Sequence, residues 1–342
     1  AQAQDEYNET ELEKNYPSSN TNIRLLEVVI ANDSNNNKIS PKVAQEIVEN
    51  KDILGVIGHQ DSSVTKAALE VYKKQGLAMV TTSTSTELKG EFFFRTNINN
   101  SKLSEKLADY LQKLDIEKAM VFYNEQNSFS RNIKEHFDTY FTSLKPGNQV
   151  ELEDLNKEYF NTKKAVQNAV DKKFQAAILF QDTKTINQAI EIAKDNNQFS
   201  EQQRLKLFSP GTLYECDTLN EGNKAVKGLI LAVPWFKGLP TAKPFLDRAV
   251  AQWGGPVEWR AATSYDAAKA FISALSNSGD NPTRAKVLEE LKEVNVPPEE
   301  TSSGQNLRFN PDGEIAGQPI LVEVVESRNP ACSNLDFRLV EE

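Results

Sequence analysis

Short apolar runs alternate with amphipathic helical patterns along almost the whole chain, and this alternation constrains the fold more than any other feature. Runs such as Ala176–Phe180 have the length of a buried strand, whereas residues 102–114 place apolar side chains at the 3.6-residue helical period. Parallel strands need long crossover connections, which helices normally supply. The alternation therefore predicts an α/β fold with mostly parallel sheets flanked by helices.

The pattern divides into two α/β units, at about residues 1–99 and 100–234, followed by three helices that have no strands between them and must cover a sheet already made. The predicted strands are 25–31, 53–57, 77–80, 92–95, 119–123, Ala176–Phe180, 205–208, 228–233 and Ile320–Glu326. The predicted helices are 42–49, 64–75, 102–114, 130–141, 163–172, 185–195, 242–253, 264–276 and 283–294. The sequence begins with a helical pattern, so the strand that normally opens such a sheet is missing or another segment takes its place.

Composition excludes several classes of function. A chain of 342 residues has room for two domains, and a net charge of −10 disfavours nucleic acid and anionic membrane surfaces as partners. No apolar run reaches the length of a membrane span, and the first eight residues do not resemble a signal peptide. Cys216 and Cys332 show no metal-ligand spacing, and they form either one disulfide or two buried thiols.

Hydroxyl side chains follow two successive predicted strands. Ser62 and Ser63 come after strand 53–57, and an unbroken run from Thr81 to Thr86 comes after strand 77–80. Such strand ends lie beside helix N-termini, whose unpaired N–H groups favour an anion. The pattern indicates a carboxylate site, with the alternative that Ser62, Ser63 and Thr84 only cap helices.

Catalytic signatures are scarce. His59 lies close to Ser62, which keeps a small α/β hydrolase using this pair as an alternative, but there is no G-x-S-x-G elbow. No dinucleotide or nucleotide-triphosphate loop and no metal-ligand cluster is present. We therefore predict a receptor that binds a small polar molecule, is not an enzyme, and needs no cofactor and no metal.

Several segments together resemble the type I periplasmic binding proteins, and most closely the branched-chain amino-acid (Leu/Ile/Val) binding proteins of ABC transporters. They appear in family order and cover nearly the whole chain. The segments are VVIANDSNN at 28–36, ILGVIGHQDSSVTKAA at 53–68, MVTTSTSTELKG at 79–90, FFFRT at 92–96, VFYNEQNSFSRNIKEHF at 121–137, AAILFQD at 176–182, LFSPGTLY at 207–214, TSYDAAKAFISAL at 263–275 and LRFNPDGEIAGQPILVEV at 307–324.

The resemblance implies two lobes joined by three crossovers, which close by a hinge motion on a ligand held in the cleft. Lobe one would contain residues 1–98 and 236–318, and lobe two residues 99–235 and 319–342. The expected function is extracytoplasmic capture of a solute, with an ABC transporter permease as partner and a periplasmic or extracellular location. The sensory ectodomain of a signalling protein is the alternative.

The resemblance also implies site residues. Ser62, Ser83 and Ser85 would hold the α-carboxylate of an amino acid, with Ser63 and Thr84 adjacent to them. From the second lobe, Phe129 would pack on the ligand.

In the family an acidic residue after a later second-lobe strand meets the ammonium group of the ligand. The matching position here is Thr212, or a neighbour that is no more acidic. Asp182, at the end of strand Ala176–Phe180, could supply the charge instead, or it could cap the helix that begins near Thr185. The pocket for the ligand's side chain depends in part on the loop after the missing strand, so side-chain specificity cannot be predicted.

Overall fold

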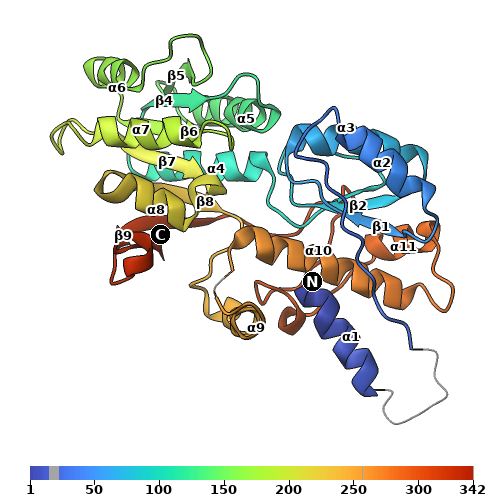
Figure 1. Cartoon of the computed structure of the whole chain (residues 1–342). Coiled ribbons are helices and arrows are strands. Elements are labelled where there is room, and N and C mark those ends of the chain that lie inside the picture. Colours follow the sequence, from blue (N-terminus) through green and yellow to red (C-terminus); the bar gives the residue numbers. More distant parts are fainter. Residues whose placement is uncertain (15–22, 256, 342) are drawn as a thin grey trace. The chain divides into compact units, whose positions relative to one another are not determined.

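The computed structural model describes residues 1–14, 23–255 and 257–341, which form two compact units (Figure 1). The first unit contains the described residues of 1–84 together with Leu88–Asn97 and Lys237–Gly317. The second contains Ser85–Glu87, Ile98–Phe236 and the described residues from Gln318 onward. Ser85–Glu87 thus groups with the second unit, although both flanking segments belong to the first. The predicted α/β fold with mostly parallel sheets is confirmed.

The first unit is built on a three-stranded parallel sheet in the order β1-β2-β3. Its strands are β1 (Gly55–Ile57), β2 (Ala78–Thr81) and β3 (Phe93–Arg95). Its helices are α1 (Gln2–Lys14), α2 (Ser40–Glu49), α3 (Ser62–Lys74), α9 (Lys243–Trp253), α10 (Trp259–Asn277) and α11 (Arg284–Lys292), with short 3₁₀ turns η3 (Pro240–Ala242) and η4 (Pro298–Glu300).

Helices cover both faces of this sheet, because successive side chains of a strand point to opposite faces. Met79 of β2 packs against the buried side of α2 and α3, in a cluster that includes Tyr72. Val80, the next residue, packs against α10 and α11, in a cluster that includes Phe271 and Leu288. Two of the three late helices therefore cover a sheet made earlier in the chain, as the sequence predicts.

The predicted strand at residues 25–31 is wrong. The structure assigns no strand there, and the side chain of Ile30 is 92% exposed. A strand needs a neighbour that takes up its backbone N–H and C=O groups. Here the backbone of Leu26 bonds to side chains of α1 instead: its N–H donates to Asn8 Oδ1 over 2.8 Å, and its carbonyl accepts from Gln4 and Asn8.

The second unit contains a seven-stranded sheet in the order β10-β9-β8-β7-β6-β4-β5. Its strands are β4 (Lys118–Tyr123), β5 (Gln149–Asp154), β6 (Ala176–Phe180), β7 (Lys206–Pro210), β8 (Ile230–Val233), β9 (Ile320–Glu326) and β10 (Leu335–Leu339). Its helices are α4 (Asn100–Lys113), α5 (Ser128–Leu144), α6 (Thr162–Asp171), α7 (Ile186–Asn196) and α8 (Cys216–Gly222), with 3₁₀ turns η1 (Gly211–Leu213), η2 (Asn223–Val226) and η5 (Pro330–Cys332). Strands β4 to β8 are parallel, and β9 and β10 extend the sheet in antiparallel fashion.

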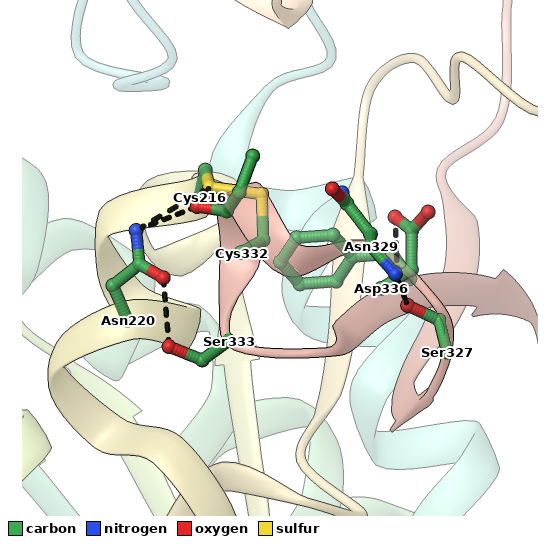
Figure 2. Close-up of a disulfide and its surroundings, with 9 residues drawn as sticks. Cys216, Asn220, Ser327, Asn329, Cys332, Ser333 and Asp336 are labelled. Carbon is green, nitrogen blue, oxygen red and sulfur yellow. Dashed lines mark hydrogen bonds between the residues drawn. A yellow bond between two sulfur atoms is a disulfide. The ribbon is translucent and has the colours of Figure 1, made fainter.

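A disulfide between Cys216 and Cys332 ties α8 to the segment between β9 and β10, which resolves the alternatives left open by the sequence (Figure 2). Asn220 of α8 supports the same junction, since its Nδ2 donates to the carbonyl of Ala331 over 3.1 Å and its Oδ1 accepts from Ser333 Oγ over 2.8 Å (Figure 2). The C-terminal strands are thus covalently attached to the helical layer of the second unit.

In the part of the chain that the structure describes, no helix is both long enough and apolar enough to cross a membrane.

Candidate functional site

Two buried hydroxyls meet at the carboxyl ends of β1 and β2 in the first unit. Ser62 Oγ and Ser83 Oγ are 2.8 Å apart, and the two residues are 4% and 1% exposed. Ser62 is the first residue of α3, and Ser83 follows β2 by two residues. Because parallel strands end at the same edge of a sheet, residues separated by 21 positions are brought into contact. We call Ser62 and Ser83 the hydroxyl pair.

Asp61, rather than a serine, caps helix α3. Its side chain accepts hydrogen bonds from the backbone N–H groups of Ser63 and Val64, and Ser63 Oγ also donates to it over 2.6 Å. The prediction that unpaired N–H groups of this helix attract an anion is therefore wrong for those two groups, which a carboxylate of the protein already binds. Because Asp61 caps the helix, the hydroxyl of Ser62 is not needed as a cap and bonds to Ser83 instead.

Threonine hydroxyls hold the loops that carry the hydroxyl pair. The carbonyl of His59 accepts from Thr65 Oγ1 over 3.1 Å and from Thr81 Oγ1 over 2.6 Å. The same Thr81 hydroxyl accepts from the backbone N–H of Ser83 over 3.0 Å. Thr81 therefore links the end of β1 to the backbone of Ser83, which fixes the position of that serine.

The imidazole of His59 does not pair with Ser62. Its Nδ1 contacts the carboxylate of Asp33, and its Nε2 lies 3.1 Å from the hydroxyl of Tyr72. Burial and the negative charge of Asp33 raise the pKa of Tyr72. Both ring nitrogens of His59 are thus engaged by other groups, and the serine–histidine pair required by the hydrolase alternative is not formed.

The three remaining hydroxyl candidates have different surroundings. Ser63 is engaged by Asp61, and the carbonyl of Thr84 accepts from Arg95 Nη1 over 3.0 Å. Ser85 is buried and its Oγ accepts from the N–H of Glu87 over 3.3 Å. Ser85 belongs to the second unit by its contacts, whereas Ser62 and Ser83 belong to the first.

Thr86, beside Ser85, explains why this tripeptide groups with the second unit. Its N–H donates to Asn132 Oδ1 over 3.1 Å, and its hydroxyl lies 2.6 Å from His136 Nε2. Both partners are on α5. Sequence reasoning gave neither of them a role, because the pairings span 46 and 50 residues.

In the second unit, a buried carboxylate lies just beyond the end of β6. Asp182 is 4% exposed, and its Oδ1 accepts from Thr185 Oγ1 over 2.6 Å and from Asn124 Nδ2 over 3.2 Å. Asn124 follows the neighbouring parallel strand β4. Helix α7 begins at Ile186, and its N-cap Thr185 makes no side-chain bond to the helix. Among the described residues no hydrogen bond is made to Asp182 Oδ2, which leaves that oxygen able to bind another partner.

Phe129 and Thr212 lie on segments that follow parallel strands of the same sheet. Phe129 is half-buried in the first turn of α5, after β4, and Thr212 is half-buried in η1, after β7. Next to Phe129, the hydroxyl of Ser128 is buried and has no hydrogen-bond partner among the described residues. Sequence reasoning missed Ser128, although its place at a helix start after a strand is the same signal that singled out Ser62.

Comparisons with known proteins agree on one architecture. A family model described as periplasmic binding protein matches residues 22–329. The structure is similar to a leucine-binding protein LivK from Thermotoga maritima, with a TM-score of 0.77 and 16% identity, covering 98% of this chain and 93% of that one. No curated protein matches the sequence.

Two further similar structures were solved with ligands. The branched-chain amino acid transporter substrate-binding protein LivJ from Streptococcus pneumoniae, in complex with isoleucine, has a TM-score of 0.74 and 14% identity, covering 99% of this chain and 94% of that one. A solute-binding protein of an ABC transporter from R. palustris, in complex with benzoate, has a TM-score of 0.75 and 14% identity, covering 94% of this chain and 87% of that one. At these identities the likeness shows the fold alone.

Proposed function

Because this chain belongs to the periplasmic binding protein family, we propose that it captures a small carboxylate-bearing molecule outside the cytoplasm and delivers it to an ABC transporter permease. An amino acid is the preferred ligand. The disulfide between Cys216 and Cys332 supports an oxidising compartment, since such bonds are rare where thiols are kept reduced.

The observation that carries the proposal is the hydroxyl pair of the first unit. Two hydroxyls that bond to each other use one of their two protons, and the other proton can be donated to an anion. A carboxylate accepts such bonds strongly because its oxygens are charged. We assign Ser62 and Ser83 to the carboxylate, with Ser85 as the third hydroxyl and with Ser63 and Thr84 beside them.

Asp182 supplies the second half of the proposed recognition. A buried ammonium group needs a charged partner, because an unpaired buried charge is very costly. Asp182 Oδ1 is already fixed by Thr185 and Asn124, so Oδ2 is held in place to accept from the ligand. We assign Phe129 to packing against the ligand, and Thr212 to a polar contact at the end of β7.

A simple carboxylate without an ammonium group is the second candidate ligand. Structurally similar proteins are described in complex with isoleucine in one case and with benzoate in another. The hydroxyl pair suits both ligands, whereas Asp182 favours only the amino acid. The charge of Asp182 therefore distinguishes the two candidates.

The test starts with a thermal-shift screen over the natural amino acids, benzoate and 3,4-dihydroxybenzoate, since a ligand of the folded state raises the melting temperature. The Asp182→Asn variant is then titrated with the strongest binder. For an amino acid we expect a loss of at least thirtyfold, because removing one partner of a buried charge pair costs about 2 kcal/mol or more. Benzoate affinity should not change.

Asp195→Asn is the matched control, since that carboxylate in the second unit also accepts from a threonine hydroxyl, Thr162 Oγ1, over 2.6 Å. It should leave both affinities unchanged. Equal amino-acid affinity in Asp182→Asn and the parent protein would refute the role of Asp182. The absence of any binder would contradict the proposed function.

A further inference from the structure

Arg95, at the end of β3, is a fully buried cation beside the loop that carries Ser83. Its side chain is 0% exposed, and β3 is paired with β2 so that Arg95 is opposite Thr81. It belongs to the FFFRT segment at residues 92–96. A buried charge needs compensating contacts, so its partners indicate what it does.

The guanidinium group holds two backbone carbonyls of one loop. Its Nη1 donates to the carbonyl of Thr84 over 3.0 Å, and its Nη2 donates to the carbonyl of Leu88 over 3.4 Å. Glu314 Oε1 lies 3.5 Å from Nη1, and the guanidinium also lies over the ring of Phe93. Burial lowers the pKa of Arg95 to about 10 while Glu314 opposes the shift, so the group stays charged at neutral pH.

A third carbonyl of the loop is held in the same way. Asn97, two residues after Arg95, donates from its Nδ2 to the carbonyl of Thr82 over 2.7 Å. The carbonyls of Thr82, Thr84 and Leu88 are thus bound by side chains from the end of β3. In a planar trans peptide the C=O and the following N–H point in opposite directions. The bond to Thr84 therefore turns the N–H of Ser85 away from Arg95.

We propose that Arg95 is a positioning residue of the carboxylate site: it binds the carbonyls on either side of Ser85–Glu87 and so sets the direction of the hydroxyl and N–H of Ser85. This inference rests on the proposed function. Carbonyl oxygens that face a carboxylate would repel it. Arg95 binds the carbonyls of Thr84 and Leu88, so these two oxygens point toward the guanidinium group. A planar guanidinium reaches two acceptors at fixed angles, which the single ammonium group of lysine cannot do.

Arg95→Lys tests the inference, because it keeps the charge and removes the fork. The probe is the best-binding carboxylate among L-leucine, L-isoleucine, benzoate and 3,4-dihydroxybenzoate, measured by calorimetric titration against its own carboxamide. We expect at least a tenfold loss for the carboxylate and less than a twofold change for the carboxamide. A general loss of structure would lower both affinities together, and that outcome, or an unchanged ratio, would overturn the inference.

Arg24→Lys is the matched control. Arg24 is an exposed arginine of the same unit that also donates to a carbonyl, that of Gly279 over 2.7 Å, and lies near a carboxylate, Asp280. It should change neither affinity. Ser62→Ala, measured in the same series, distinguishes a failure of the inference about Arg95 from a failure of the proposed carboxylate site. If Ser62→Ala weakens binding and Arg95→Lys does not, only the inference fails; if neither weakens it, the proposed carboxylate site fails.

Hydrogen exchange of the unmodified protein tests the inference without any variant. If Arg95 orders the loop in advance, the amides of Ser83, Thr86 and Glu87, which already donate to side chains of the protein, should exchange slowly before a ligand is added, at rates within tenfold of those of β2. Fast exchange that becomes slow only when the probe is added would mean that the ligand orders the loop, and it would overturn the inference.

Discussion

The two units differ most in the extent of their sheets. The sheet of the first unit has three short parallel strands. The sheet of the second has seven, of which β9 and β10 are antiparallel and lie at one edge, and a disulfide ties the segment between these two strands to α8. Both units still place polar side chains at the carboxyl ends of their parallel strands. Polar side chains therefore gather at strand ends whether the sheet has three strands or seven.

The chemistry at the strand ends differs as well. The first unit presents the hydroxyls of Ser62 and Ser83, which can donate to an anion, and the second presents the carboxylate of Asp182, which can accept from a cation. The proposal of an amino-acid ligand rests on this difference.

Removing the disulfide should destabilise the second unit alone. The bond joins residues separated by 116 positions, but residues 237–317 between them belong to the first unit; with that unit folded, the bond closes about 36 residues of the second, worth roughly 4 kcal/mol in the chain-entropy account. In the Cys216→Ser, Cys332→Ser variant we expect hydrogen exchange in β6 and β7 to report a loss of about that size, with β2 and β3 unchanged. An equal loss in both units would show that they do not unfold separately.

The first unit contains a buried acid whose protonation should make its stability depend on pH. Burial raises the pKa of Asp266 to about 6, although Ser302 donates to both of its oxygens over 2.7 Å. The folded state thus binds this proton more tightly than the unfolded chain. Its contribution should be fully present below pH 4 and lost as the pH rises through 6, by about 3 kcal/mol.

Asp266→Asn isolates that contribution, because the amide can bond to Ser302 without carrying a charge. In urea unfolding of the first unit, the difference between the parent protein and the variant should change by about 3 kcal/mol between pH 4 and pH 7.5, with the variant more stable at the higher pH. Parallel pH profiles would contradict the assignment. The second unit should show no difference at either pH.

Ser62→Ala should weaken binding of the carboxylate probe by about 1.5–3 kcal/mol, a tenfold to hundredfold loss, because a hydrogen bond to a charged group is removed. Ser40→Ala is the control. Ser40 is a fully buried serine of the same unit whose hydroxyl donates to the carbonyl of Val64 over 3.1 Å, and its loss should not change affinity. Titration calorimetry measures both, and equal affinities in the two variants would remove Ser62 from the site.

Ile30→Thr should change the stability of the first unit by no more than about 0.5 kcal/mol, since the side chain is exposed. The matched substitution in the second unit, Ile178→Thr in fully buried β6, should cost more than about 2 kcal/mol, because it removes apolar contacts and buries a hydroxyl. Urea unfolding measures both. A large loss for Ile30→Thr would show that residues 25–31 are packed as a strand after all.

The sequence predicts a helix or strand correctly where the apolar periodicity is clear and where the folded chain places a packing or pairing partner beside that segment. Helix α4 and strand β6 were found where the periodicity predicts them. Strand β5 was missed because it is a half-exposed edge strand whose sequence, QVELED, is mostly polar. Residues 25–31 have the right composition but no strand beside them, and strand formation depends on that neighbour as much as on propensity.

The same limit applies to the site. Ser62 and Ser83 are in contact because each follows one of two adjacent parallel strands, and the sequence predicts both of these strands. The capping of α3 by Asp61, the bond from Asn124 to Asp182 and the two carbonyls held by Arg95 depend on three-dimensional contacts that spacing does not encode. The roles of the hydroxyls, Phe129, Asp182 and Thr212 toward a ligand stay predictions.

Under the proposed function, the hydroxyls of the first unit bind a carboxylate and Asp182 binds an ammonium group. Calorimetric titration with three matched compounds tests it most directly: L-leucine, its carboxamide, and 4-methylpentanoate, which lacks the amine, or the same trio built on whichever amino acid the thermal-shift screen selects. The amino acid should bind at least tenfold more tightly than either analogue. Equal affinity for the amino acid and its carboxamide would contradict it.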